Sequence, residues 1–80
     1  MEVKVLLFAT LRQLAGWKEK VVELPEEANL GDLLARLTDD HPQLNLTQRT
    51  IYAAVNEQYA QRDTRLTEKD VVAIFAVCGC

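Results

Sequence analysis

The chain opens on an alternation of hydrophobic and polar residues with a period of two, which is typical of a β-strand. Val3, Val5 and Leu7 share one face of this predicted strand, and its second face is half apolar. A similar alternation over residues 18–24 ends at Pro25 and predicts a second strand. The chain therefore begins with two strands that are joined by a short connection.

Two further apolar runs predict strands in the second half of the chain. Residues 51–55 form a short run, and a turn separates it from a short strand at Tyr59. The charged segment 61–70 follows, with Leu66 as a lone apolar anchor. Residues 71–77 are almost continuously apolar, which suits a strand that is buried on both faces.

Two segments between the predicted strands have patterns that are typical of helices. Leucines at positions i, i+3, i+4 and i+7 predict the main helix over about residues 30–40, and Asn29 is a good N-cap for it. Thr10 and Gln13 match a capping box, which predicts a short helix over residues 10–15. The fold therefore contains one main helix and one minor helix.

The order of these elements predicts an α+β two-layer roll, with the main helix on one face of a mixed four- to five-stranded sheet. The first and last strands are the most apolar, so we expect them to be central, parallel neighbours. His41 precedes Pro42 and is expected to end the main helix, and the polar residues 43–50 are expected to form a loop. We place the domain at residues 1–75 and a flexible C-terminal tail at residues 76–80.

The composition narrows the function classes. The chain has 80 residues, of which 49% are hydrophobic and 26% are charged, and this is typical of one globular domain. Its net charge of −3 argues against binding to nucleic acid or to an anionic membrane surface. No segment has the length of a membrane span or the pattern of a signal peptide, so we expect a cytoplasmic protein.

Alternate residues of the two central strands form the first candidate site. If Val3, Val5 and Leu7 face the main helix, the residues between them face away from it, and the same holds in the last strand. The sequence thus predicts an apolar patch on the open side of the sheet, which consists of Leu6, Phe8, Ala73 and Phe75. Open-face patches of this kind are typical of partner surfaces, although a loop that covers the patch is the alternative.

The second candidate site is the end of the chain, which reads Phe75-Ala76-Val77-Cys78-Gly79-Cys80. A short peptide of small residues suits insertion into the narrow site of another protein, and five residues reach about 17 Å when extended. A frayed terminus is the alternative. Cys78 and Cys80 lack the further ligands of a zinc site, and a disulfide between them would be strained, so we favour two free thiols and expect no metal.

These residues resemble a known family, the small subunit of molybdopterin synthase (MoaD). The resemblance is most specific in the opening Val3-Lys4-Val5-Leu6-Leu7-Phe8-Ala9-Thr10-Leu11-Arg12-Gln13-Leu14-Ala15-Gly16, and it continues through residues 33–37, Pro42, the Ala54-Val55-Asn56 turn and residues 66–75. The related thiamine sulfur carrier (ThiS) resembles the chain less, because it usually lacks the short helix after the first strand. The resemblance implies a β-grasp, ubiquitin-like fold.

The resemblance also implies a function, that of a non-catalytic sulfur carrier in molybdenum cofactor biosynthesis. In that family a MoeB-like activating enzyme consumes ATP to adenylate the C-terminal carboxylate, which then becomes a thiocarboxylate. The tail inserts into the large subunit (MoaE-like) and gives its sulfur to the pterin precursor. The implied partner-binding residues are Leu6, Phe8, Ala73, Phe75, Val77 and Cys78, and the implied site of activation is Gly79-Cys80. No bound cofactor is implied.

This chain departs from the family at three places, one of which is Ala76, where proline-rich residues often precede the tail of the family. The family ends in Gly-Gly, whereas this chain ends in Gly79-Cys80, which leaves open a natural variant, a processed end or a homologue that no longer carries sulfur. Lys69 lies near the place where the family usually has a glycine, in the turn before the last strand. A ubiquitin-like binding module without sulfur transfer is the competing interpretation, and a redox or metal tail is a third.

Overall fold

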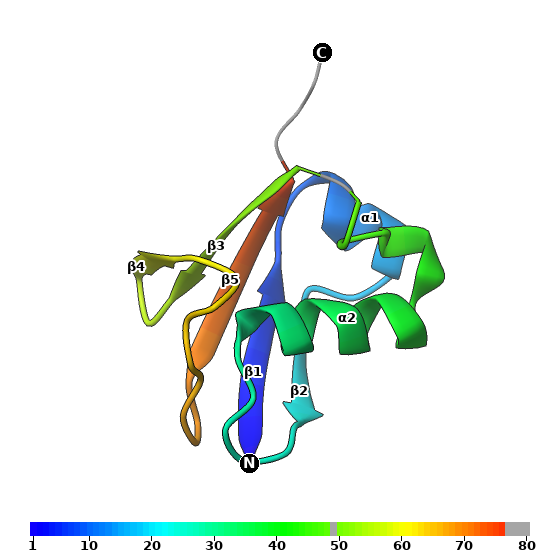
Figure 1. Cartoon of the computed structure of the whole chain (residues 1–80). Coiled ribbons are helices and arrows are strands. Elements are labelled where there is room, and N and C mark those ends of the chain that lie inside the picture. The colour runs from blue at the N-terminus through cyan, green and yellow to red at the C-terminus, as the bar shows by residue number, and fades with distance from the viewer. Residues whose placement is uncertain (49, 77–80) are drawn as a thin grey trace.

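A five-stranded mixed sheet with helices on one face forms the fold of the computed structural model, which describes residues 1–48 and 50–76 (Figure 1). The elements in chain order are β1 (Glu2–Leu7), α1 (Thr10–Ala15), β2 (Glu19–Glu23), α2 (Leu30–Asp40), a 3-10 turn (Pro42–Leu44), β3 (Ile51–Val55), β4 (Gln58–Ala60) and β5 (Val71–Ala76). The strand order is β2-β1-β5-β3-β4. This arrangement confirms the predicted α+β roll.

The first and last strands lie side by side at the centre of the sheet, as the sequence predicts. They are parallel, and their register pairs Leu6 with Ala73 and Leu7 with Ile74. The other neighbouring strands are antiparallel. β5 extends to Ala76, one residue beyond the predicted domain boundary, and Val77–Cys80 lie outside the described residues.

The main helix begins and ends as the sequence predicts. The Asn29 side chain accepts a hydrogen bond of 2.9 Å from the Asp32 backbone N–H, and the Asp32 carboxylate accepts one of 3.0 Å from the Asn29 N–H. These two bonds satisfy donors that the first turn of a helix leaves free. At the other end the N–H of His41 donates to the carbonyl of Leu37 at 2.8 Å. α2 therefore crosses the sheet as a well-capped helix (Figure 1).

The prediction of a capping box in the short helix was wrong. Thr10 is the first helical residue of α1 rather than its cap, and the preceding Ala9 makes no side-chain hydrogen bond and has φ of 50°. Burial holds this helix in place instead, because Leu11 is fully buried in the core. Gly16 ends the helix with φ of 83°, in the left-handed region where glycine is favoured.

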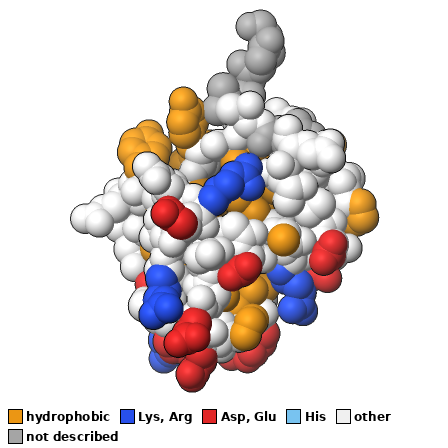
Figure 2. Space-filling view, in the orientation of Figure 1, with side chains coloured by type: hydrophobic (Ala, Val, Ile, Leu, Met, Phe, Trp, Pro, Cys, Tyr) orange, Lys and Arg blue, Asp and Glu red, His pale blue; other side chains and the backbone are white. Residues whose placement is uncertain are grey.

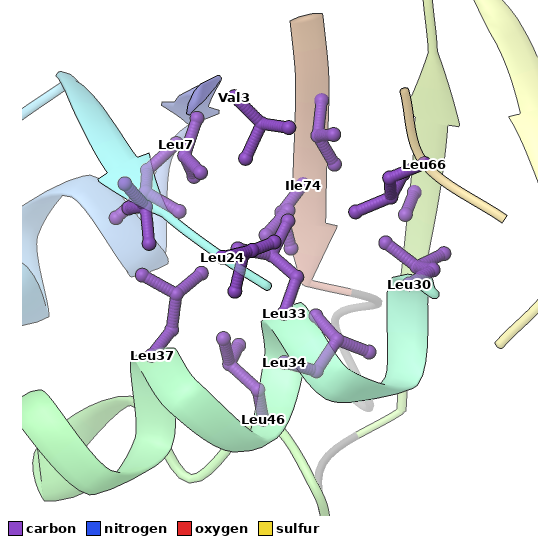
Figure 3. Packing of buried hydrophobic residues seen from close by; sticks show 14 of the residues in the cluster. Val3, Leu7, Leu24, Leu30, Leu33, Leu34, Leu37, Leu46, Leu66 and Ile74 are labelled. Atoms are coloured by element: carbon purple, nitrogen blue, oxygen red, sulfur yellow. The ribbon is translucent and has the colours of Figure 1, made fainter. Parts of the chain in front are cut away.

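The core lies between α2 and the sheet. Figure 3 shows Leu33 and Leu37 of α2 in the same cluster as Leu7 and Ile74 of the strands, and the exposed fraction of each is 1% or less. This confirms the predicted core face of α2, and it leaves the opposite face of the sheet without a helix (Figure 1).

The prediction of a polar loop over residues 43–50 was wrong in two places. Leu44 and Leu46 are fully buried, and Leu44 lies in the 3-10 turn that follows α2. The Leu46 N–H donates a hydrogen bond of 3.1 Å to the hydroxyl of Thr38, which holds the segment against α2. Isolated leucines in a polar stretch show no periodicity, so the pattern did not reveal them.

Candidate functional site: the open face of the sheet

The open face of the sheet carries the four apolar residues that the sequence placed there. Leu6 and Phe8 come from the β1 side, and Ala73 and Phe75 come from β5. All four line one hollow of about 680 Å³, which we call the sheet hollow. The prediction that these residues share one patch is confirmed, whereas their contact with a partner stays a prediction.

Two stacked aromatic rings lie on this face at the C-terminal ends of β1 and β5. The ring centroids of Phe8 and Phe75 are 4.7 Å apart and the planes differ by 12°. The guanidinium of Arg12 lies 5.9 Å from the Phe8 ring, and its Nε donates to the Leu7 carbonyl at 3.4 Å. Phe75 nevertheless remains 38% exposed, so a large apolar surface is held in a fixed orientation and is accessible to a partner.

The sequence analysis missed the contribution of β3 and β4 to this face. The register places Tyr52 opposite Phe75 and Ala54 opposite Ala73, and Tyr59 of β4 lies opposite Ala54. Tyr52 and Tyr59 are mostly exposed, and their rings meet edge to face at 6.1 Å. The two-residue period of Ile51–Val55 could have placed Tyr52 and Ala54 on this face if the neighbour of this strand had been known.

The remaining part of the sheet hollow is formed by the β3–β4 turn and the beginning of β5. Asn56, Glu57, Tyr59 and Val71 line it together with Ala54. Asn56 and Glu57 both have positive φ, at 52° and 71°, which is the geometry of a two-residue hairpin turn. The hollow therefore has an aromatic, apolar wall on one side and a polar turn on the other.

Figure 2 shows the opposite side of the molecule, on which α2 lies. Acidic and basic side chains are intermixed over its lower half, and hydrophobic side chains project at its upper left edge and also show between the charged side chains (Figure 2). Charge is therefore dispersed on this side, which is typical of a solvated surface.

Asp70 is a buried charged residue behind the β3–β4 turn, and only 7% of it is exposed. Its carboxylate accepts hydrogen bonds from the Thr67 N–H at 2.7 Å, the Thr67 hydroxyl at 2.8 Å and the Asn56 amide at 2.9 Å. Burial alone would raise the pKa of Asp70, but the hydrogen bonds from Thr67 and Asn56 outweigh it and the pKa is lowered below 3.8. This carboxylate is therefore charged at neutral pH.

The remaining predicted site residues are those of the C-terminal tail, and the remaining chemical candidate is His41. Val77, Cys78, Gly79 and Cys80 lie outside the described residues. His41 ends α2, as predicted, and its Nε2 lies 3.4 Å from the Lys20 ammonium. Over the described ranges 1–48 and 50–76, no three His, Cys, Asp or Glu side chains cluster as metal ligands would.

A membrane-spanning element is also missing from the described part of the chain. None of its helices has both the length and the apolar character that crossing a bilayer requires.

Comparison with known proteins extends over nearly the whole chain. The family model described as the ThiS family matches residues 5–79. The molybdopterin synthase sulfur carrier subunit of Chlamydomonas reinhardtii is 38% identical over 77 residues, which cover 94% of this chain and 93% of that protein. The protein of the same name from Dictyostelium discoideum is 30% identical and covers 92% of this chain and 90% of its own length.

A solved structure agrees with these relatives. A Pyrococcus furiosus protein described as a molybdopterin converting factor subunit 1 superimposes with a TM-score of 0.85 and 34% sequence identity. The match covers 95% of this chain and 97% of that chain. These similarities confirm the resemblance to the molybdopterin synthase small subunit and the β-grasp fold.

Proposed function

Because this chain belongs to the ThiS family, we propose that it is the sulfur carrier subunit of a molybdopterin synthase. The observation that carries this proposal is the match, over nearly full length, to curated relatives of that name. They favour the molybdopterin carrier over the thiamine-type carrier. In this role the chain supplies the transferred group, and catalysis belongs to its partners.

The geometry of the open face supports the proposed role. β5 carries Ala73 and Phe75 on this face, and the chain continues from Ala76 toward Gly79 and Cys80. Four residues span at most about 14 Å. A partner that binds the stacked Phe8 and Phe75 rings therefore has the end of the chain within reach of a nearby active site. We propose that this partner is the large subunit of the synthase.

The proposed chemistry takes place at the α-carboxylate of Cys80. A carboxylate oxygen attacks the α-phosphorus of ATP in the activating enzyme, so that a mixed anhydride forms and pyrophosphate leaves. A sulfide equivalent from a sulfur donor then attacks the acyl carbon and expels AMP, which takes one carboxylate oxygen with it. The chain is left with a thiocarboxylate, whose sulfur can be transferred to the pterin precursor in the large subunit.

Gly79 and Cys80 affect this chemistry in opposite ways. Gly79 has no side chain, so its backbone can pass through a narrow channel, and Gly79→Val should block both activation and insertion. Cys80 adds a side chain at the acyl residue, where the family has glycine. Replacing Cys80 by glycine should therefore raise the yield of thiocarboxylate if the side chain is an obstruction.

Intact mass spectrometry tests the proposal. The chain is incubated with an activating enzyme, ATP and a sulfur donor, alongside the Gly79→Val and Cys80→Gly variants. In the wild-type chain we expect a mass increase equal to the difference between one sulfur and one oxygen atom. A larger fraction of the Cys80→Gly molecules should carry this increase, and the Gly79→Val variant should show none of it. If neither the wild type nor Cys80→Gly is ever modified, the chain is a binding module without sulfur transfer.

A further inference from the structure

Asp70 makes hydrogen bonds to three separate segments of the chain. Its carboxylate binds Thr67 in the preceding loop and Asn56 in the β3–β4 turn, and its backbone carbonyl accepts a hydrogen bond of 2.9 Å from Lys4 of β1. A buried carboxylate is unfavourable unless donors surround it, and here three donors do so. Its surroundings therefore fix its position.

Asn56 links the buried Asp70 carboxylate to the β3–β4 turn at the surface. Its amide nitrogen donates to Asp70 at 2.9 Å, and its amide oxygen accepts from the Val71 N–H at 3.0 Å. Its backbone N–H also donates to the Val71 carbonyl at 2.8 Å. Asn56 thus spans the gap between a hairpin turn and a neighbouring strand, and both ends of its side-chain amide have a partner.

We propose that Asp70 is a positioning residue for partner docking and acts through Asn56, which holds the polar wall of the sheet hollow in place. The wall consists of Asn56, Glu57 and Tyr59, and all three line the hollow beside Phe75. This inference rests on the proposed function for the identity of the partner, which is the large subunit of the synthase. A wall held in one position does not have to be ordered during binding, and this preserves affinity.

The pairing of donors and acceptors makes the inference testable. In Asp70→Asn an amide N–H₂ would face either the Asn56 amide or the Thr67 N–H, and each of these is also a donor. In Asn56→Asp two carboxylates would face each other.

The double variant, which carries both substitutions, exchanges these roles. The amide introduced at position 70 would donate to the carboxylate introduced at position 56, and that carboxylate would accept from the Val71 N–H in place of the Asn56 amide oxygen. The oxygen of the new amide at position 70 would still accept from the Thr67 N–H. The exchange should therefore restore the wall.

Two measurements on the full chain form the experiment. Affinity for a molybdopterin synthase large subunit is measured by calorimetry for the wild type, Asp70→Asn, Asn56→Asp and the double variant. The position of Tyr59 is followed by NMR contacts between the Tyr52 and Tyr59 rings, whose centroids are 6.1 Å apart. Val22→Ala serves as a matched control, because Val22 is buried in β2, away from the wall. All affinities are measured at a temperature where each variant is folded.

We expect each single variant to bind about tenfold more weakly and to lose the tyrosine contact, since the competent fraction falls. The double variant should recover both, and Val22→Ala should be less stable with unchanged affinity. The inference is overturned if the single variants retain the contact between the tyrosine rings or bind the large subunit like the wild type. It is also overturned if the double variant recovers neither the affinity nor the ring contact. If the wild type does not bind the large subunit, the proposed function fails, and the ring contacts alone then decide whether Asp70 positions the wall.

Discussion

The two faces of the sheet are built from the same strands but differ in their side chains and in their burial. The face under α2 is aliphatic, and Val5, Leu7 and Ile74 on it are completely buried. The open face is aromatic, and Phe75 on it stacks against Phe8 yet stays 38% exposed. Branched aliphatic side chains fill an interior, whereas stacked rings present a flat, rigid surface to a partner. An apolar run in a small domain can thus serve folding on one face and binding on the other.

A cavity under α2 should affect folding most strongly. We expect Leu37→Ala to lower the free energy of unfolding by about 2–5 kcal/mol, because Leu37 is 1% exposed and its loss leaves a hole in the core. Denaturant unfolding gives this value. Leu14→Ala is the control: Leu14 is 38% exposed, and its replacement should cost about 1 kcal/mol or less. Equal losses in the two variants would contradict the assigned core.

A charge on the open face should spare folding and weaken partner binding. We expect Phe75→Glu to reduce the free energy of binding to the large subunit by about 2–4 kcal/mol, because the carboxylate is desolvated only in the complex. Calorimetry measures the affinity, and thermal unfolding checks the free protein. Val21→Glu is the control, since Val21 is 54% exposed on the β2 edge of the same face. Undiminished affinity of Phe75→Glu would remove the stacked rings from the docking surface.

Acid should destabilise the protein through Asp70, the buried carboxylate that directly precedes β5. The pKa of this carboxylate is lowered in the folded state, because hydrogen bonds from Thr67 and Asn56 outweigh the effect of burial. The stabilisation is therefore fully present above pH 3.8 and is lost as the pH falls through the lower folded-state pKa. Urea unfolding between pH 6 and pH 2, chosen as roughly the range that brackets this titration, should show a shallower acid decline in Asp70→Asn. Identical slopes in the two proteins would disprove this assignment.

The smallest expected effect is a gain in stability in the turn before β5. Lys69 has φ of 67°, in the region where glycine is favoured, so Lys69→Gly should stabilise the fold by about 0.5–1 kcal/mol. Asp63→Gly is the control, because Asp63 has no positive φ and glycine only adds freedom to the unfolded chain there. Chemical denaturation compares the two, and a loss of stability in Lys69→Gly would show that its side chain has a role in the fold.

The sequence patterns predicted those features that depend on a single strand or helix packing against the core. The alternation of Val3, Val5 and Leu7 and the leucine spacing around Leu33 and Leu37 each follow from one element packing on one core. The apolar patch followed once the central strands were assumed to be neighbours. These predictions needed only the period of each element.

The missed features depend on contacts between distant segments. Tyr52 joins the open face only because β3 pairs with β5, and Leu44 is buried only because the turn after α2 folds back on the core. Thr10 matched a capping motif, but the chain turns one residue earlier, where Ala9 has a positive φ. The period of β3 groups Tyr52 with Ala54 but does not show which face of the sheet they join, and the burial of Leu44 and the turn at Ala9 leave no periodic signal.

The parallel pairing of β1 with β5 has a consequence for the order in which the chain acquires its structure during synthesis. β1 leaves the ribosome before the other elements of the sheet, whereas its central neighbour β5 follows only after them. The sheet cannot close over its core before then, and such non-local pairing is slow. Every folded molecule therefore already contains Phe75 on its surface, and under the proposed function an incomplete nascent chain would not compete for the large subunit.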